Sequence, residues 1–531
     1  MQPHEVVVDR SKPVPELSFG SAFNASITLV DRHLTLGRGA KVMAKTNRGN
    51  MTYADLADGT NRMANVLHGL GVRRGDRVLL LVTDSPAFYF AFLGTIRLGA
   101  VAVLASTYLR RADYAYMLGE SAARVVVASP VVFAELTEAL KDPEVKVEHV
   151  IATANPSQGW LALDDVLKSA DALLTVEPTT AKSECFWLYS SGSTGKPKAA
   201  VHQHKDLIYA AVMYAEGILG LNENDVIFSV GKLFFAYGIN NSLGFPLWAG
   251  ASVILLEERA NAENSLAVMS AEKPSIYFTV PTMLVAQAAA MENGTPADLS
   301  SLRACVCGGE PLADALFDRW KKLTGHELIE GIGSSEVLHI YISNRIGHIK
   351  LGSLGRVVPG YEAAIRDSSG KDVPPGELGE IAIRGESVAT YYWNKPEKTA
   401  ECMRDGWFYS GDSGSMDQNG YFYFAGRRDD MLRVGGMWVS PAEVEAALMS
   451  HPSVLEAAVV GAVDENKLTK PKAYVVLRQN STAHPELESE LIQFAKTRIA
   501  NFMAPRWIEF MPDLPKTATG KIQRFRLRAG P

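Results

Sequence analysis

The sequence has few of the features that mark secreted, zinc-binding or nucleic-acid-binding proteins. Its 531 residues include 4 cysteines, too few for a disulfide framework, and none belongs to a spaced Cys/His array that would hold zinc. A net charge of -6 and scattered Lys and Arg create no field that gathers polyanions. No signal-like segment opens the chain, and the most apolar stretch, 85–106, is interrupted by Gly94, Arg97 and Gly99. We therefore expect a cytoplasmic protein without nucleic-acid or membrane partners.

Apolar residues are plentiful, at 47% of the chain, and the length exceeds what one hydrophobic core supports, so at least two domains are expected. Apolar strand-like runs at 77–82 and 124–128 alternate with helical patterns at 85–98 and 111–119. This alternation predicts an α/β fold, and the unbroken apolar strands predict sheets covered on both faces.

The pattern changes after Gly360. Short strands with Gly and Pro turns, at 373–384 and 420–426, predict a small β-rich subdomain. A polar segment at 427–430 then precedes a new α/β pattern, with a helix expected from about Pro441 to Met449. We expect a large N-terminal domain of layered α/β subdomains plus this β-rich subdomain, residues 1–428, followed by a small mobile α+β domain, residues 429–531.

A strand-like run at 186–189 leads into a segment rich in hydroxyls, glycines and lysines. Glycines let the backbone approach an anion closely, hydroxyls donate to phosphate oxygens or meet a metal, and lysines neutralise charge. The segment is not a Walker A loop, because Pro197 and the extended run 199–202 follow instead of a helix. A flexible Gly/Ser linker is the alternative, and its position directly after a buried strand disfavours it.

Residues 189–198 resemble the phosphate-binding signature of the superfamily that comprises acyl-CoA synthetases, peptide-synthetase adenylation domains and luciferases. The resemblance extends from about residue 30 to the end of the chain, because other signatures of that superfamily follow in order, at 307–311, 332–336, 409–412, 426–430 and 514–521.

The resemblance implies that ATP, Mg²⁺ and coenzyme A are bound. Lys521 would be the catalytic lysine, Glu336 and Thr194 would hold the metal, and Asp429 would be the hinge on which the C-terminal domain turns. Asp412 would accept hydrogen bonds from the ribose. The other implied nucleotide- and cofactor-binding residues are Ser190, Ser191, Gly192, Ser193, Gly195, Lys198, Gly309, Glu310, Pro311, Gly331, Ile332, Gly333, Ser334, Ser335, Arg427, Gly435 and Gly436.

Within the superfamily, segments 232–238 and 330–340 resemble the benzoate-CoA ligase branch, with no acid near Phe235 that would pair with the ammonium of an amino acid. A planar pocket for an aromatic acid is implied. Its implied residues are Phe235, Ala236, Tyr237, Gly333, His339 and Ile340. The chain departs from many relatives at Arg433 and Trp438, in the segment implied for the thioester step.

The sequence thus predicts an AMP-forming aryl-CoA ligase for benzoate or a substituted benzoate, acting as a monomer or homodimer. Three alternatives remain open at this point. One is a ligase for another acid, such as a hydroxy- or aminobenzoate or a cyclic or short-chain acid. Another is an adenylation enzyme that loads a carrier protein, and the third is a nucleotide-binding protein without turnover.

Overall fold

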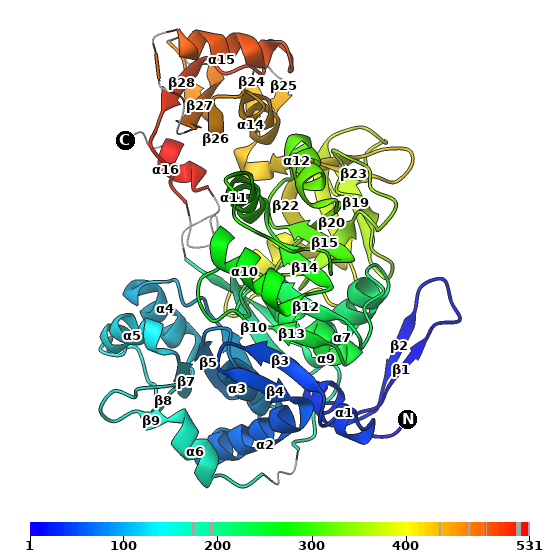
Figure 1. Ribbon diagram of the computed structural model, residues 1–531, viewed down its shortest axis with the longest axis vertical. Coiled ribbons are helices and arrows are strands. Elements are labelled where there is room, and N and C mark those ends of the chain that lie inside the picture. The colour runs from blue at the N-terminus through cyan, green and yellow to red at the C-terminus, as the bar shows by residue number, and fades with distance from the viewer. Residues whose placement is uncertain are drawn as a thin grey trace.

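The computed structural model consists of a large domain and a small C-terminal domain, which lies at the top of Figure 1 in orange and red. It describes residues 1–172, 176–190, 196–434, 437–465, 468–478, 481, 483–484, 486–516 and 522–528, with only the backbone of Asp429 and Trp438.

The first sheet of the large domain has seven strands in the order β11-β10-β6-β5-β7-β8-β9, and its only antiparallel pair joins β10 and β11. On β5, Val78 and Leu80 face one apolar cluster while Leu79 and Leu81 face another. Both faces of the sheet are therefore covered, which confirms what the unbroken apolar strands predict. The elements are α2 (Tyr53–Gly69), β5 (Arg77–Leu81), α3 (Pro86–Arg97), β6 (Val101–Leu104), α4 (Arg111–Ser121), β7 (Val125–Ala128), β8 (His149–Ala152), β9 (Leu161–Ala162), β10 (Glu184–Ser190) and β11 (Lys198–Gln203).

The second sheet has nine strands in the order β18-β17-β16-β15-β14-β12-β13-β3-β4. The run from β16 to β3 is parallel, so the strands from β12 to β16 end at one edge of the sheet. Helices α10, α11 and α12 lie against one face of this sheet (Figure 1). The elements are β3 (Val42–Thr46), β4 (Gly49–Thr52), β12 (Val226–Ser229), β13 (Ser252–Ile254), α10 (Ala262–Glu272), β14 (Ile276–Thr279), α11 (Pro281–Glu292), β15 (Ala304–Gly308), α12 (Asp314–Thr324), β16 (Leu328–Gly333), β17 (Ile340–Ser343) and β18 (Arg356–Val357).

An antiparallel sheet completes the large domain and confirms the predicted β-rich subdomain. It is built from β19 (Glu362–Arg366), β20 (Gly379–Arg384), β21 (Met403–Arg404), β22 (Trp407–Met416) and β23 (Phe422–Arg427).

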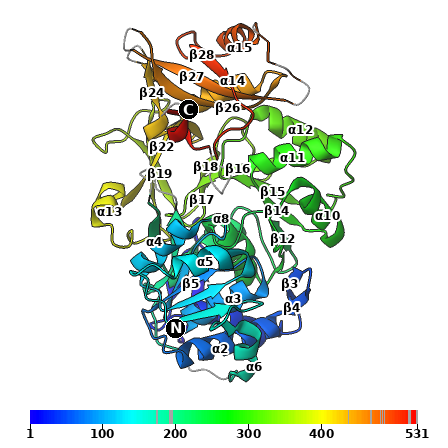
Figure 2. The same cartoon turned by 90° about the vertical axis from the view of Figure 1, so that its left-hand side faces the viewer.

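The small domain pairs a three-stranded sheet with two main helices, as expected for an α+β unit (Figure 2). Helix α14 begins where the pattern predicts, because Ser440 Oγ accepts a hydrogen bond from the backbone of Glu443 (3.2 Å) and Pro441 needs no donor there. The elements are β24 (Leu432–Val434), β25 (Met437–Val439), α14 (Pro441–Met449), β26 (Val454–Val463), β27 (Thr469–Leu477), α15 (Leu487–Lys496), β28 (Trp507–Phe510) and α16 (Arg524–Arg528).

Among the described residues, none of the helices has both the length and the apolar character that a membrane span requires. All the cysteines are free, and Cys305 and Cys307 are buried on β15.

Candidate functional site

The predicted phosphate loop connects two paired strands. Ser190, at the end of β10, lies opposite Lys198, at the start of β11, so the residues on either side of the predicted phosphate loop are neighbours in the sheet. The Ser190 hydroxyl is buried and has no hydrogen-bond partner among the described residues. A buried hydroxyl without a partner costs free energy unless a ligand or water supplies one. This position therefore suits the proposed contact with phosphate.

Three side chains from distant parts of the chain meet beside this loop. Lys198 Nζ lies 2.9 Å from Glu336 Oε1 and donates a hydrogen bond of 2.6 Å to the Tyr392 hydroxyl, which in turn donates one of 2.7 Å to the same Glu336 oxygen. Lys198 also lies over the Tyr392 ring, 4.2 Å from its centroid. The sequence predicts Lys198 and Glu336 as site residues but not Tyr392.

Glu336 is suited to hold a cation. Burial alone would raise the pKa of its carboxyl, but Lys198 and the Tyr392 hydroxyl outweigh burial and lower the pKa to about 2. Glu336 is therefore an ionised carboxylate at neutral pH, which is the form of a carboxyl group that binds Mg²⁺. No cluster of three His, Cys, Asp or Glu side chains suited to a metal occurs in the described ranges.

The predicted adenine-binding segment follows β15. Gly309 has a φ of 89°, a left-handed conformation that favours glycine, and the Glu310 carboxylate accepts a hydrogen bond of 2.7 Å from Thr282 Oγ1. The backbone N–H of Leu312 donates to Glu330 Oε1 (3.0 Å), which ties the segment to the neighbouring strand β16.

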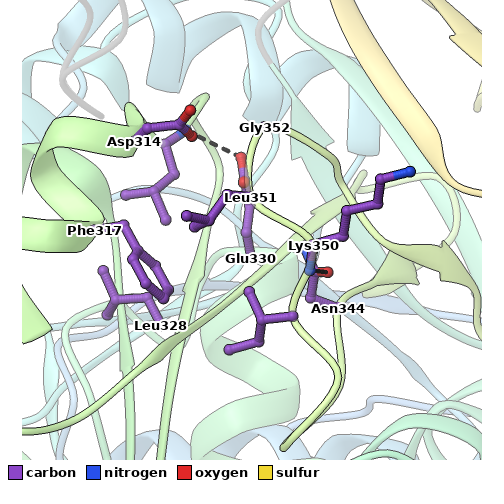
Figure 3. Close-up of a pocket in the computed structure, with 10 residues that line it drawn as sticks. Asp314, Phe317, Leu328, Glu330, Asn344, Lys350, Leu351 and Gly352 are labelled. Atoms are coloured by element: carbon purple, nitrogen blue, oxygen red, sulfur yellow. Dashed lines mark hydrogen bonds between the residues drawn. The ribbon is translucent and has the colours of Figure 1, made fainter.

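Behind the segment lies a small hollow, where Glu330 points toward the start of α12 and lies close to Asp314 (Figure 3). Burial raises the pKa of the Glu330 carboxyl to about 7; the hydrogen bond from the Leu312 N–H opposes this increase, and the charge of Asp314 adds a smaller one. The group that supports the adenine segment therefore titrates near neutral pH.

The proposed ribose-binding residue Asp412 lies on β22 directly opposite Arg427 on β23. Arg427 Nη1 donates a hydrogen bond of 2.8 Å to Asp412 Oδ1. The strand register therefore brings together two residues that the sequence places separately at the nucleotide.

The proposed acyl-binding segment is fixed by a buried lysine. Lys232 Nζ donates to the carbonyls of Leu256 and Glu258, both at 2.5 Å, and lies 3.7 Å from Asp84. Only glycine fits at position 238, because a Cβ atom there would lie 1.9 Å from the Lys232 carbonyl oxygen. The chain thus turns tightly between them and starts α8 (Ala236–Ile239).

His339 lies in a box of aromatic rings. Its ring stacks on Tyr237 with centroids 5.5 Å apart, and Tyr214 and Phe245 approach to 4.7 Å and 4.6 Å. Burial lowers the pKa of His339 to about 3, so the imidazole is neutral. Its Nε2 lies 2.9 Å from the Asn241 side-chain oxygen, whereas its Nδ1 is buried without a partner among the described residues. Because a carbonyl oxygen only accepts, Nε2 carries the proton and Nδ1 is a bare acceptor.

A short connection places this box next to Glu336. Gly333 on β16 pairs with Ile340 on β17, and Leu338 between them has a φ of 76°, an unusual value for a bulky residue. Asn240 Nδ2 donates to the Leu338 carbonyl (2.9 Å), which holds the turn. Such conformations concentrate at functional sites. The cation-binding candidate and the aromatic box therefore share one turn.

The remaining predicted residues are placed as follows. Phe235 immediately precedes α8, and Ala236 is its first residue. Ile332 lies on β16, and Ser334 and Ser335 follow this strand, where the Ser335 carbonyl lies 2.8 Å from His202 Nε2. Pro311 and Gly331 lie in the adenine segment and on β16, while Asp429 is described only by its backbone, in the turn before β24. Eight predicted site residues lie outside the described residues: Ser191, Gly192, Ser193, Thr194, Gly195, Gly435, Gly436 and Lys521.

Sequence reasoning did not predict Tyr392, Tyr214, Phe245 or Asn241. The last three lie in helical segments of apolar character, where an aromatic residue is usually part of a core. Tyr392 follows no glycine-rich or charged pattern, so only its three-dimensional position reveals it.

Comparison with known proteins gives concordant matches for both domains. Residues 35–393 match the family described as AMP-binding enzyme, and residues 443–521 match the AMP-binding enzyme C-terminal domain. The chain is 43% identical over 526 residues to the benzoate-CoA ligase of Thauera aromatica, covering 98% of this chain and 99% of that protein.

Two solved structures are similar over nearly the whole chain. One is an anthranilate CoA ligase in complex with anthranoyl-AMP, with a TM-score of 0.91, 39% identity and coverage of 96% of this chain and 98% of that one. The other is a benzoate CoA ligase from Burkholderia xenovorans LB400, with a TM-score of 0.88, 41% identity and coverage of 95% and 100%.

Proposed function

Because the chain belongs to the AMP-binding enzyme family, we propose that it joins benzoate or a close substituted benzoate to coenzyme A, using ATP and releasing AMP and pyrophosphate. The observation that carries this proposal is the single turn between β16 and β17. It presents Glu336 toward Lys198 and, three residues later, His339 within an aromatic box. An aromatic carboxylate bound in the box would have its carboxyl group beside the phosphate-binding residues.

In the first half-reaction, the acid's carboxylate attacks the α-phosphorus of ATP, forming an acyl-adenylate and expelling pyrophosphate. Lys198 and the 190–195 segment would bind phosphate oxygens, and Asp412 would accept hydrogen bonds from the ribose hydroxyls. Glu336 and Thr194 would hold Mg²⁺, which neutralises phosphate charge when bound. Lys521 would stabilise the charge that moves between carboxylate and phosphate oxygens.

In the second half-reaction, the thiol of coenzyme A displaces AMP from the acyl-adenylate. We place the domain boundary between residues 428 and 429 and propose that the small domain turns about Asp429. The turn would withdraw Lys521 and bring Arg433 and the Gly435–Gly436 segment to the site.

Exchange of labelled pyrophosphate into ATP tests the first half-reaction, and CoA-dependent release of AMP tests the second. Benzoate should support both, and no exchange with any aromatic acid would refute the proposal. Lys521→Ala should abolish exchange while leaving thioester formation from supplied benzoyl-adenylate nearly intact. Equal loss of both steps would refute the domain turn.

A benzoate with a hydrogen-bond donor on the ring is the second candidate substrate, because His339 Nδ1 is a buried acceptor without a partner in the described part of the chain. An amino or hydroxyl substituent would satisfy it, and one of the similar structures is an anthranilate ligase. Ratios of kcat/KM for 2-aminobenzoate, 3- and 4-hydroxybenzoate and benzoate decide between the candidates. His339→Phe should erase any preference for a donor-bearing ring.

Three finer points remain proposals. We propose free coenzyme A as the acceptor, which a comparison with a phosphopantetheine carrier protein at equal concentration would test. A cytoplasmic location fits the free cysteines. A monomer or homodimer is proposed, and sedimentation at several protein concentrations would distinguish them.

A further inference from the structure

Tyr392 is a buried tyrosine that contacts both charged residues of the proposed phosphate and metal site. It is 1% exposed, and its hydroxyl accepts a hydrogen bond from Lys198 and donates one to Glu336. Few side chains can do both at once, because carboxylates only accept and ammonium groups only donate. The hydroxyl is therefore a neutral group that satisfies a cation and an anion together.

The backbone around Tyr392 is fixed to the same elements. Residues 390–393 pair with β11: Val201 N donates to the Tyr391 carbonyl (3.0 Å), and Trp393 N donates to the Ala199 carbonyl (2.9 Å). The N–H of Ala389 also donates to the Glu336 carbonyl (2.7 Å). The segment that carries the tyrosine thus holds the start of β11 and the backbone of Glu336, so the hydroxyl is presented from a fixed scaffold.

A direct Lys198–Glu336 ion pair is a poor resting state for a site that must bind ATP and a cation. Each charged group satisfies the other, so phosphates have to compete for the ammonium and the cation has to compete for the carboxylate. Lys198 Nζ and the Tyr392 hydroxyl both meet the same carboxylate oxygen of Glu336, Oε1. With Tyr392 as a shared partner, each group keeps one hydrogen bond when the ion pair separates.

We propose that Tyr392 is a positioning residue that lets Lys198 turn to the ATP phosphates and Glu336 turn to Mg²⁺ without either losing its last partner. This inference rests on the proposed function, because it takes Glu336 as the metal-holding group. It predicts that Tyr392 governs how much Mg²⁺ the enzyme needs to bind ATP, and not how well it binds the aromatic acid.

The neighbouring tyrosine provides a matched control. Tyr391 also has a hydrogen-bonded hydroxyl, but it donates to Glu184 at the opposite end of β10 from the phosphate loop. Tyr391→Phe and Tyr392→Phe therefore each delete one hydroxyl from adjacent positions, and only the second touches Lys198 and Glu336.

The experiment is calorimetric titration of ATP into the full-length protein at a series of Mg²⁺ concentrations. For Tyr392→Phe we expect the Mg²⁺ concentration that supports half-maximal ATP binding to rise about 10-fold, with an unchanged KM for the acid in pyrophosphate exchange. Tyr391→Phe should match the wild type. An unaltered Mg²⁺ requirement in Tyr392→Phe, or an equal change in both variants, would overturn the inference.

A second variant separates positioning from a structural role. If Tyr392 acts through Glu336, Glu336→Gln combined with Tyr392→Phe should need no more Mg²⁺ than Glu336→Gln alone, whereas additive effects would contradict the inference. Urea unfolding without ligand monitors folding of each variant. If the wild-type protein itself shows no Mg²⁺-dependent ATP binding, the proposed function fails, which is a different result from a normal wild type with an unaffected Tyr392→Phe.

Discussion

The Lys198–Glu336 pair should be strongly coupled in the free protein, and a double-mutant cycle can measure this. The pKa of Glu336 falls from 4.5 to about 2 in the folded protein. At about 1.4 kcal/mol per pKa unit, the folded protein favours the charged over the protonated form of Glu336 by about 3 kcal/mol more than water does. The side chains are only 19% and 8% exposed, so solvent screens the pair weakly. Glu336→Gln should therefore lower the free energy of unfolding by about 3 kcal/mol.

The cycle uses Glu336→Gln, Lys198→Met and the double variant. Because the double variant leaves no buried charge without its partner, its loss should be smaller than the sum of the two single losses. The ring centroids of Trp187, on β10, and Trp393, next to Tyr392 in sequence, lie 4.4 Å apart, so tryptophan fluorescence follows urea unfolding of the large domain. A coupling energy below about 0.5 kcal/mol, the range of exposed pairs, would refute the reasoning.

The lowered pKa of Glu336 also determines how its contribution to the free energy of unfolding changes with pH. A carboxyl whose pKa is lowered by folding stabilises the protein above its unfolded value of 4.5, and this contribution disappears as pH falls toward 2. The penalty of Glu336→Gln should thus be constant between pH 5 and pH 8. A penalty that changes within this window would mean that another group titrates with the pair.

Three further predictions concern other parts of the site. The pKa of Glu330 is raised from 4.5 to about 7, so its stabilising contribution is present below pH 4.5 and is lost as pH rises through 7. Glu330→Gln should remove about 2.5 kcal/mol of the stability difference between pH 5 and pH 8 in urea unfolding, and an unchanged difference would contradict the assignment. Gly238→Ala should lower the free energy of unfolding by about 3 kcal/mol or more, because the added Cβ would lie 1.9 Å from the Lys232 carbonyl oxygen. A thermal midpoint equal to that of the wild type would show that the turn is looser than described. We propose that Ile340, which is buried and follows His339, lines the acid site. Ile340→Ala should then raise kcat/KM for 4-substituted benzoates about 10-fold relative to benzoate. No change in this ratio would place Ile340 outside the proposed acid site.

Local features of the fold were predictable because they depend on neighbours in sequence. The apolar run at 77–82 forms β5, and the helical pattern at 441–449 forms α14. The short strands predicted after Gly360 form the antiparallel sheet. Strand pairing was not predictable to the same degree. That Asp412 lies opposite Arg427 depends on a register set by the whole sheet, and nothing near either residue encodes it.

The sequence by itself determined which chemical groups are available and in what order: the hydroxyl-rich phosphate segment, Glu336, Asp412, and the aromatic segment before His339. Only the tertiary structure decided that Lys198, Glu336 and Tyr392, which lie far apart along the chain, share hydrogen bonds. The reason is physical. A residue's type and local pattern fix what it can bond to, whereas the partner that satisfies a buried charge is chosen by packing, which brings together segments that carry no signal of one another.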